Sequence, residues 1–269
     1  MGGRGRRGGG HHERRRRCGL RDAVVRAQGA GEIRALLERH GVHPKKRLGQ
    51  NFLADPNVVD RIVRVAAVRG GDRVVEVGAG TGTLTAALVA TGATVVAYEV
   101  DRGLAPVLAE TLAGAGVDLR FGDVSRLRLG DELEGGPWTM VANLPYNVGT
   151  GIVLDVLRGS PQVTRLVVMV QREVADRFLA APGSRIYGLP SVVVAMHGRG
   201  RVEFTVPPSV FIPRPPVVSA VVSIDRVAPP ARSETAIALA AAAFGQRRKM
   251  VRRSLADAVS DSEALLAAA

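Results

Sequence analysis

Apolar residues along this chain gather into short runs, separated by segments long enough to form helices. The runs at 73–77 (RVVEV), 94–100 (TVVAYEV) and 165–170 (RLVVMV) have the length and β-branched content of buried strands. Shorter runs at 118–121 and 139–142 follow the same pattern. Strands that alternate with helices and are apolar on both faces are typical of a parallel sheet covered on both sides. The pattern therefore predicts a doubly wound α/β fold.

The two ends of the chain depart from this alternation. Residues 32–40 (EIRALLERH) have the pattern of a short amphipathic helix, and a glycine and a proline follow it. Further on, the β-rich stretches 202–206 and 217–224 have no helix-length segment between them. They predict an antiparallel pair at the edge of the sheet. An alanine-rich segment from about 233 predicts a last helix, which ends in the basic run 246–253.

Charge points to a polyanionic partner. The 269 residues carry a formal net charge of +12, and Lys and Arg gain affinity when they displace counterions from phosphates. Residues 1–20 hold seven Arg and one Glu, so this low-complexity stretch supplies half of that charge. Its low apolar content predicts a disordered basic arm that holds RNA. An over-extended start or a cloning remnant explains the same stretch equally well.

Several protein classes are disfavoured. The single cysteine, Cys18, allows no internal disulfide and no multi-cysteine zinc site, and we expect no bound metal. No apolar run approaches the roughly 18–20 residues of a membrane span, and no apolar segment near the N-terminus resembles a secretory signal. We therefore expect a cytoplasmic protein that does not enter the membrane, and we expect it to be a monomer.

A glycine-rich turn after the first strand predicts a cofactor site. Gly78 and Gly80 would let the backbone approach a ligand closely, although Thr83 occupies the place of the third glycine of a dinucleotide-binding fingerprint. Glu99 ends the second strand about 20 residues later, where its carboxylate can accept protons from both ribose hydroxyls. Asp123 follows the third strand and can take an adenine amino group. Nicotinamide and adenosylmethionine sites share these features.

The fourth strand runs into Asn143, Leu144, Pro145 and Tyr146, a motif suited to methylation of an adenine amine. The N6 lone pair of adenine is delocalised into the ring, and two acceptors aimed at the NH₂ group would draw it out. Asn143 would offer its amide oxygen and Leu144 its carbonyl, while Pro145 would fix the backbone. Tyr146 would stack on the base. No strong base is needed, so catalysis would rest on positioning and electrostatics.

At this point the chain resembles the ribosomal RNA adenine N6,N6-dimethyltransferase family, whose members modify two adjacent adenosines near the 3′ end of small-subunit RNA. The resemblance covers about 32–255 in unbroken order. It is carried by KKRLGQNFLAD (45–55), VVEVGAGTGTLT (74–85), YEVD (98–101), GDV (122–124), NLPYN (143–147), VQREVADR (170–177), YGLPSV (187–192), VPPSVFIPRPPVVSAVV (206–222) and FGQRRKMVRRSL (244–255).

This resemblance implies a Rossmann-like class I methyltransferase with a mostly parallel seven-stranded sheet and a short helical C-terminal domain. We expect a basic tail at 1–31, the methyltransferase domain at 32–228 and a helical RNA-binding domain at 229–269. The implied cofactor is S-adenosyl-L-methionine, and the implied partner is ribosomal RNA in a precursor of the small ribosomal subunit. Phe211 would be a second aromatic on the target base. The implied cofactor contacts are Asn51, Leu53, Gly78, Gly80, Glu99, Asp123 and Asn143.

Two basic clusters are candidates for RNA binding. They are Lys45, Lys46 and Arg47 before the cofactor site, and Arg247, Arg248 and Lys249 near the C-terminus. The chain departs from the family in two ways. Its glycine turn has the sequence GAGTG where many members have a proline after the first glycine, and it ends about fourteen residues after RRKMVRRSL. The second departure predicts an abbreviated second domain.

Three alternatives compete with this interpretation. One is the related enzyme that methylates a single large-subunit adenosine and confers macrolide resistance, although NLPYN and FGQRRKMVRRSL resemble the small-subunit branch better. Another is a non-catalytic nucleic-acid-binding relative, as in mitochondrial transcription factors, which the intact Glu99, Asp123, Asn143 and Tyr146 disfavour. A nicotinamide dehydrogenase leaves NLPYN unexplained.

Overall fold

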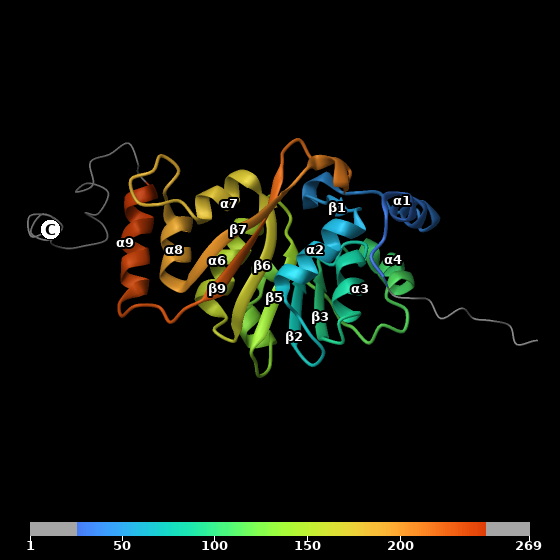
Figure 1. The fold of residues 1–269 in the computed structure, drawn as a ribbon, viewed down its shortest axis with the longest axis horizontal. Helices are drawn as coiled ribbons and strands as arrows, with labels where there is room; N and C mark the ends of the chain where they lie inside the picture. The colour runs from blue at the N-terminus through green and yellow to red at the C-terminus, as the bar shows by residue number, and fades with distance from the viewer. Residues whose placement is uncertain (1–25, 246–269) are drawn as a thin grey trace, which may run out of the picture.

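Seven strands form one sheet in the computed structural model, which describes residues 26–245 (Figure 1). They are β2 (Arg73–Val77), β3 (Thr94–Glu99), β4 (Asp118–Phe121), β5 (Trp138–Asn143), β6 (Val163–Gln171), β7 (Gly198–Val206) and β9 (Ser219–Arg226). Their spatial order is β4-β3-β2-β5-β6-β9-β7. The first five run parallel, whereas β9 is antiparallel to both β6 and β7. The predicted mostly parallel seven-stranded sheet is confirmed.

Helices cover both faces of this sheet, which confirms the doubly wound prediction. Buried side chains on one face come from α1 (Ala30–Arg39), α2 (Pro56–Ala66), α3 (Thr83–Val89) and α4 (Ala105–Thr111). The other face is covered by α5 (Leu129–Glu132), α6 (Gly149–Gly159), α7 (Arg172–Phe178), α8 (Leu189–His197) and α9 (Ser233–Gly245). Strand β2 shows why its valines occupy neighbouring positions and do not alternate with polar residues. Val74 packs toward the first set of helices, while Val75 and Val77 pack toward the second.

The predicted antiparallel pair at the sheet edge is also confirmed, but its edge strand is longer than the sequence indicated. Strand β7 begins at Gly198, four residues before the predicted start. Glycines are poor strand formers, so the GRGR sequence hid this beginning. Here the glycines have a packing reason, because a Cβ atom at Gly198 would lie 2.5 Å from Cγ2 of Ile224 on the neighbouring strand.

A second, two-stranded sheet was not predicted. Strand β1 (Phe52–Leu53) pairs antiparallel with β8 (Phe211–Ile212), so residues about 160 positions apart meet in one short ladder. Two-residue strands carry no periodic signal that a sequence pattern can reveal. The pairing matters for function because β1 continues a segment that lies over the candidate site.

The predicted domain boundaries need correction at residues 26–31, which were assigned to the basic tail. Ala27 is buried, and the backbone N–H of Gln28 donates a hydrogen bond of 2.6 Å to Oγ1 of Thr83. These residues therefore belong to the folded body. At the other end, α9 buries Ile237 in the same core as β6 and α6, so its described part is not a separate domain. Arg247, Arg248 and Lys249 lie outside the described residues, as does Cys18.

Two kinds of feature are absent from residues 26–245. No helix there has the length and apolar character that crossing a membrane requires. No group of three or more His, Cys, Asp or Glu side chains there is arranged to hold a metal ion.

Candidate functional site

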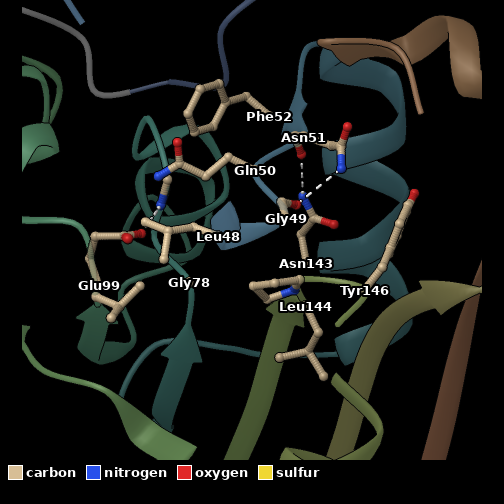
Figure 2. Close-up of a pocket in the computed structure, with 13 residues that line it drawn as sticks. Leu48, Gly49, Gln50, Asn51, Phe52, Gly78, Glu99, Asn143, Leu144 and Tyr146 are labelled. Carbon is tan, nitrogen blue, oxygen red and sulfur yellow. Dashed lines mark hydrogen bonds between the residues drawn. The ribbon is translucent and has the colours of Figure 1, made fainter. Parts of the chain in front are cut away.

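An open pocket lies at the carboxyl ends of β2, β3 and β5. The strand order reverses between β2 and β5, and doubly wound sheets bind their ligands at such a switch point. One wall is a segment that precedes α2, which we call the covering segment (residues 45–52). Figure 2 shows the covering segment on one side of the pocket and the strand ends with Glu99 and Asn143 on the other. The lining consists of Leu48, Gly49, Gln50, Asn51, Phe52, Gly78, Gly80, Glu99, Val100, Asn143, Leu144, Pro145 and Tyr146.

The glycine turn after β2 brings bare backbone to the floor of this pocket. Gly78 and Gly80 have φ angles of +85° and +59°, which side chains of L-residues rarely allow. A Cβ atom at Gly80 would also lie 3.2 Å from Cδ1 of Phe52 in the covering segment. The turn therefore needs glycine for its conformation and for its distance to the opposite wall.

Glu99 is held in a fixed orientation at the end of β3. It is only 5% exposed, and its two carboxylate oxygens accept backbone N–H bonds of 2.8 Å each, from Gly80 and from Asp101. Burial raises the pKa of this carboxyl, although the two N–H donors oppose the rise. The predicted ribose-binding carboxylate thus lies in the pocket wall, where the protein alone already fixes its position.

The Asn143–Tyr146 motif forms the opposite side of the pocket. Nδ2 of Asn143 donates a hydrogen bond of 3.1 Å to the carbonyl of Asn51, which leaves the amide oxygen of Asn143 as its unused acceptor (Figure 2). The Leu144 side chain is buried, so only its backbone can act in the pocket. The Pro145 carbonyl accepts a hydrogen bond of 2.8 Å from the N–H of Gly149, which ties the motif to the first turn of α6.

Tyr146 is half-buried and its ring orientation is fixed. Its hydroxyl lies 2.6 Å from Oγ of Ser219, which is fully buried at the start of β9. Sequence analysis did not identify Ser219, because a serine that opens a strand gives no signal on its own. The contact links the end of β5 to β9, two strands away in the sheet.

Three predicted site residues do not line the pocket. Leu53 and Phe211 face each other in the small β1–β8 sheet and are buried in the core, with Phe211 only 3% exposed. Asp123 follows β4, but its carboxylate accepts bonds from the N–H and hydroxyl of Ser125 and pairs with Arg126 at 3.4 Å. These partners hold Asp123 as the N-cap of a short 3₁₀ turn.

Lys45 is not available for RNA in the way that the sequence suggested. Its ammonium group pairs with Asp101 at 2.6 Å, and Asp101 is buried. Lys46 and Arg47 are exposed, and neither has an ion-pair partner among residues 26–245. The first basic cluster therefore divides into one structural lysine and two free cations.

A buried acid below the glycine turn was also missed. Glu76 in β2 is 1% exposed, and its Oε2 has no hydrogen-bond partner in the described part of the chain. Burial, together with the nearby charge of Glu99, raises the pKa of Glu76 to about 8. The sequence hides it because RVVEV resembles any other buried strand.

We expect this acid to make stability fall as pH rises. The folded pKa is about 8 and the ordinary value is 4.5, so unfolding releases a proton between these values. Glu76→Gln removes that release. As pH rises, the free energy of unfolding of the variant minus that of the wild type should therefore grow by up to about 1.4 kcal/mol per pH unit. Urea denaturation of both proteins across this range measures it. If the two proteins differ in free energy of unfolding by the same amount at pH 5 and at pH 8, Glu76 is not a neutral acid in the folded protein.

Comparison with known proteins finds relatives in one family. The sequence profile of the ribosomal RNA adenine dimethylase family matches residues 41–268. A protein named ribosomal RNA small subunit methyltransferase A from Acidothermus cellulolyticus is 45% identical over 252 residues, covering 90% of this chain and 86% of that protein. The protein of the same name from Leifsonia xyli is 46% identical, covering 91% and 90%.

Solved structures share the fold. A dimethyladenosine transferase from Plasmodium falciparum superposes with a TM-score of 0.64 at 24% identity, covering 76% of this chain and 74% of the other. The 23S rRNA methyltransferase ErmE gives a TM-score of 0.63 at 26% identity, covering 77% and 84%.

Proposed function

This chain belongs to the ribosomal RNA adenine dimethylase family, and from that premise we propose that it transfers methyl groups from S-adenosylmethionine to adenine N6 in small-subunit ribosomal RNA. The substrate is two adjacent adenosines near the 3′ end of 16S RNA, and each receives two methyl groups. The observation that carries this proposal is the pocket in which Glu99 and Asn143 face the covering segment. The small-subunit assignment is supported by relatives of that name at about 45% identity, whereas the large-subunit enzyme ErmE is 26% identical.

The residues present fit S-adenosylmethionine. The pocket is lined by backbone and polar groups that suit a nucleoside, and the backbone at Gly78 and Gly80 lies bare on its floor. Glu99 would accept both ribose hydroxyls, and Asn51 would contact the methionine part from the covering segment. Asp123 lies at the end of the next strand, where its carboxylate would take the adenine amino group once it exchanges its bond to Ser125.

Bound S-adenosylmethionine supplies a methyl group on a positively charged sulfur. Held by Glu99 and Asn51, the cofactor would give this methyl group to the N6 lone pair of the target adenine, and the bonding electron pair would stay on sulfur. The nitrogen would then lose a proton to water. Asn143 Oδ1 and the Leu144 carbonyl would accept the two N6 hydrogens, which holds the lone pair toward the methyl group.

Base holding is assigned to Tyr146. Its ring lines the pocket and is oriented by Ser219, so it can stack on an unpaired adenine. Phe211 was expected to cover the other face of the base, but it is buried against Leu53. We therefore assign Phe211 to the small sheet that supports the covering segment, and we propose only one aromatic clamp.

Reconstitution tests this function. The purified chain would be incubated with S-adenosylmethionine and small ribosomal subunits that lack dimethyladenosine, and primer extension would then locate stops near the 3′ end of the RNA. Two adjacent stops that depend on cofactor are expected, because dimethyladenosine blocks reverse transcriptase. Large-subunit RNA should give none. Stops only in the large-subunit RNA would overturn the small-subunit assignment.

Lys46 and Arg47 should contribute to RNA binding. Log affinity falls as log salt rises, and replacing both residues by glutamine should make this fall less steep. The slope should decrease in magnitude by about 0.7–0.9 for each phosphate that these side chains neutralise. Arg64 and Arg69 are equally exposed but lie toward the amino end of β2, far along α2 from the pocket, so their double replacement is the matched control. Filter binding to small subunits at several salt concentrations measures both. Equal slopes in all three proteins would show that Lys46 and Arg47 do not contact RNA phosphates.

A further inference from the structure

The covering segment (residues 45–52) is fixed to the body at both ends of the pocket. On the side of the target base, the carbonyl of Asn51 accepts the hydrogen bond from Asn143. Gly49 lies against the same motif, since a Cβ atom there would stand 2.9 Å from Oδ1 of Asn147. On the side of the cofactor ribose, the side-chain hydrogen bonds of the segment's Lys45 and Gln50 go to Asp101.

Asp101 lies directly beyond β3, and its carboxylate accepts two hydrogen bonds from the covering segment and a third, of 2.9 Å, from the N–H of Gly103. Its carboxylate accepts a hydrogen bond of 2.6 Å from Nζ of Lys45 and one of 2.9 Å from Nε2 of Gln50. The backbone N–H of Lys45 donates to Oε1 of Gln50 at 2.7 Å, which closes a three-residue network. Asp101 is 4% exposed, so water competes little with these bonds.

Electrostatics favours the charged form of this carboxylate. Burial alone would raise the pKa of Asp101, but the hydrogen bonds from Lys45 and Gln50 and the charge of Lys45 together hold it below the ordinary value. The network therefore persists at neutral pH. Opening the covering segment would leave a buried carboxylate without its main cation, which is costly.

The same residue also touches the ribose-binding acid, but through its backbone. The N–H of Asp101 donates to Oε1 of Glu99 at 2.8 Å, while Oε2 of Glu99 accepts from Gly80. A side-chain substitution at Asp101 leaves this N–H in place. The two roles of the residue can therefore be separated by experiment.

From this geometry we propose that Asp101 is a positioning residue that fastens the covering segment over the cofactor. The inference rests on the proposed function, because the ligand under the segment is S-adenosylmethionine. Asp101 touches neither the cofactor nor the target base. It acts through Lys45 and Gln50, and its effect is to slow the exchange of bound cofactor by keeping the segment closed.

The fastening itself can be measured without any ligand. Asp101→Asn keeps the shape of the side chain, but it removes the negative charge beside Lys45 and puts an NH₂ group in place of one accepting oxygen, so the segment should open more often. Trypsin cuts after Lys46 and Arg47 remain possible in every variant of this test, and mass spectrometry can follow these two cuts alone. We expect cleavage there to be about tenfold faster or more in Asp101→Asn, the scale of a missing charge-assisted hydrogen bond.

The control is Asp118→Asn. Asp118 also pairs with an arginine, Arg120, but at the outer edge strand β4 and away from the segment, so its replacement should leave these cuts unchanged. Lys45→Gln removes the cation from the other side of the network. Its effect and that of Asp101→Asn should not add in the double variant, since both break one interaction.

Cofactor exchange gives the second measurement. Dissociation of S-adenosylmethionine, followed by stopped flow with excess competitor, should be about tenfold faster in Asp101→Asn and unchanged in Asp118→Asn. Unchanged cleavage and unchanged dissociation in both Asp101→Asn and Lys45→Gln would overturn the proposal. A wild-type chain that binds no S-adenosylmethionine, with faster cleavage in Asp101→Asn, would overturn the proposed function and support the fastening of the segment.

Discussion

Glu99→Ala is expected to weaken S-adenosylmethionine binding by about 2–4 kcal/mol, roughly 30- to 1,000-fold in affinity. The carboxylate is buried and already fixed by the N–H groups of Gly80 and Asp101, so it needs no reordering to receive the ribose. Its removal deletes a charged acceptor for both hydroxyls and leaves two buried donors unpaired. Calorimetry with the wild type and the variant measures the difference directly.

A cofactor analogue sharpens this test. An S-adenosylmethionine analogue without the 2′-hydroxyl should bind wild type more weakly than the natural cofactor, but it should bind Glu99→Ala no more weakly. Glu99→Gln keeps the shape yet turns an NH₂ group toward the N–H of Gly80 or Asp101, so it should also lose affinity. Thermal unfolding checks that each variant folds. Equal affinity of wild type and Glu99→Ala for the natural cofactor would remove Glu99 from the site.

The parallel part of the fold was predictable because four of its five strands are largely buried, and only the edge strand β4 is not. All five parallel strands were located within two residues at each end, since turn residues and helix-length segments separate these apolar-rich runs. Residues that follow these strands were predictable for a related reason. Carboxyl ends of parallel strands meet at one edge, so Gly78, Glu99 and Asn143 had to lie close together.

What could not be predicted depends on contacts between distant parts of the chain. Lys45 and Asp101 are 56 residues apart, and nothing in a run of three basic residues shows that one of them has a buried partner. The short β1–β8 ladder is similar, because its pairing buries Phe211, which the family resemblance had placed on the target base. Local patterns report periodicity and turns, whereas these features are decided by tertiary packing.

The buried glutamates Glu76 and Glu99 show a second limit of prediction from sequence. Both are glutamates within strand runs, and both have a raised pKa because they are buried. Only their places differ: Glu76 lies inside β2 with an unpaired oxygen, while Glu99 ends β3 and lines the pocket. Position relative to the strand end distinguishes a candidate ligand residue from a buried acid in the core.

Asn143→Ala is expected to slow methyl transfer by about 100-fold or more. The hydrogen bond from its Nδ2 to the Asn51 carbonyl fixes the amide, so Oδ1 is preorganised as an acceptor for an N6 hydrogen. That acceptor matters most as positive charge develops on nitrogen in the transition state. Tyr146→Ala removes only stacking, worth about 1–3 kcal/mol, and should leave measurable activity.

Single-turnover methyl transfer at saturating cofactor isolates the chemical step, because Asn143→Ala also frees Asn51 in the covering segment and lowers cofactor affinity. RNA affinity should be nearly kept. Asn57→Ala is the matched control, since Asn57 is an exposed asparagine in the first turn of α2 and does not line the pocket. It should transfer methyl groups at close to the wild-type rate. If Asn143→Ala does the same under these conditions, Asn143 does not polarise the amine, and the chemistry must rest on the Leu144 carbonyl and on positioning alone.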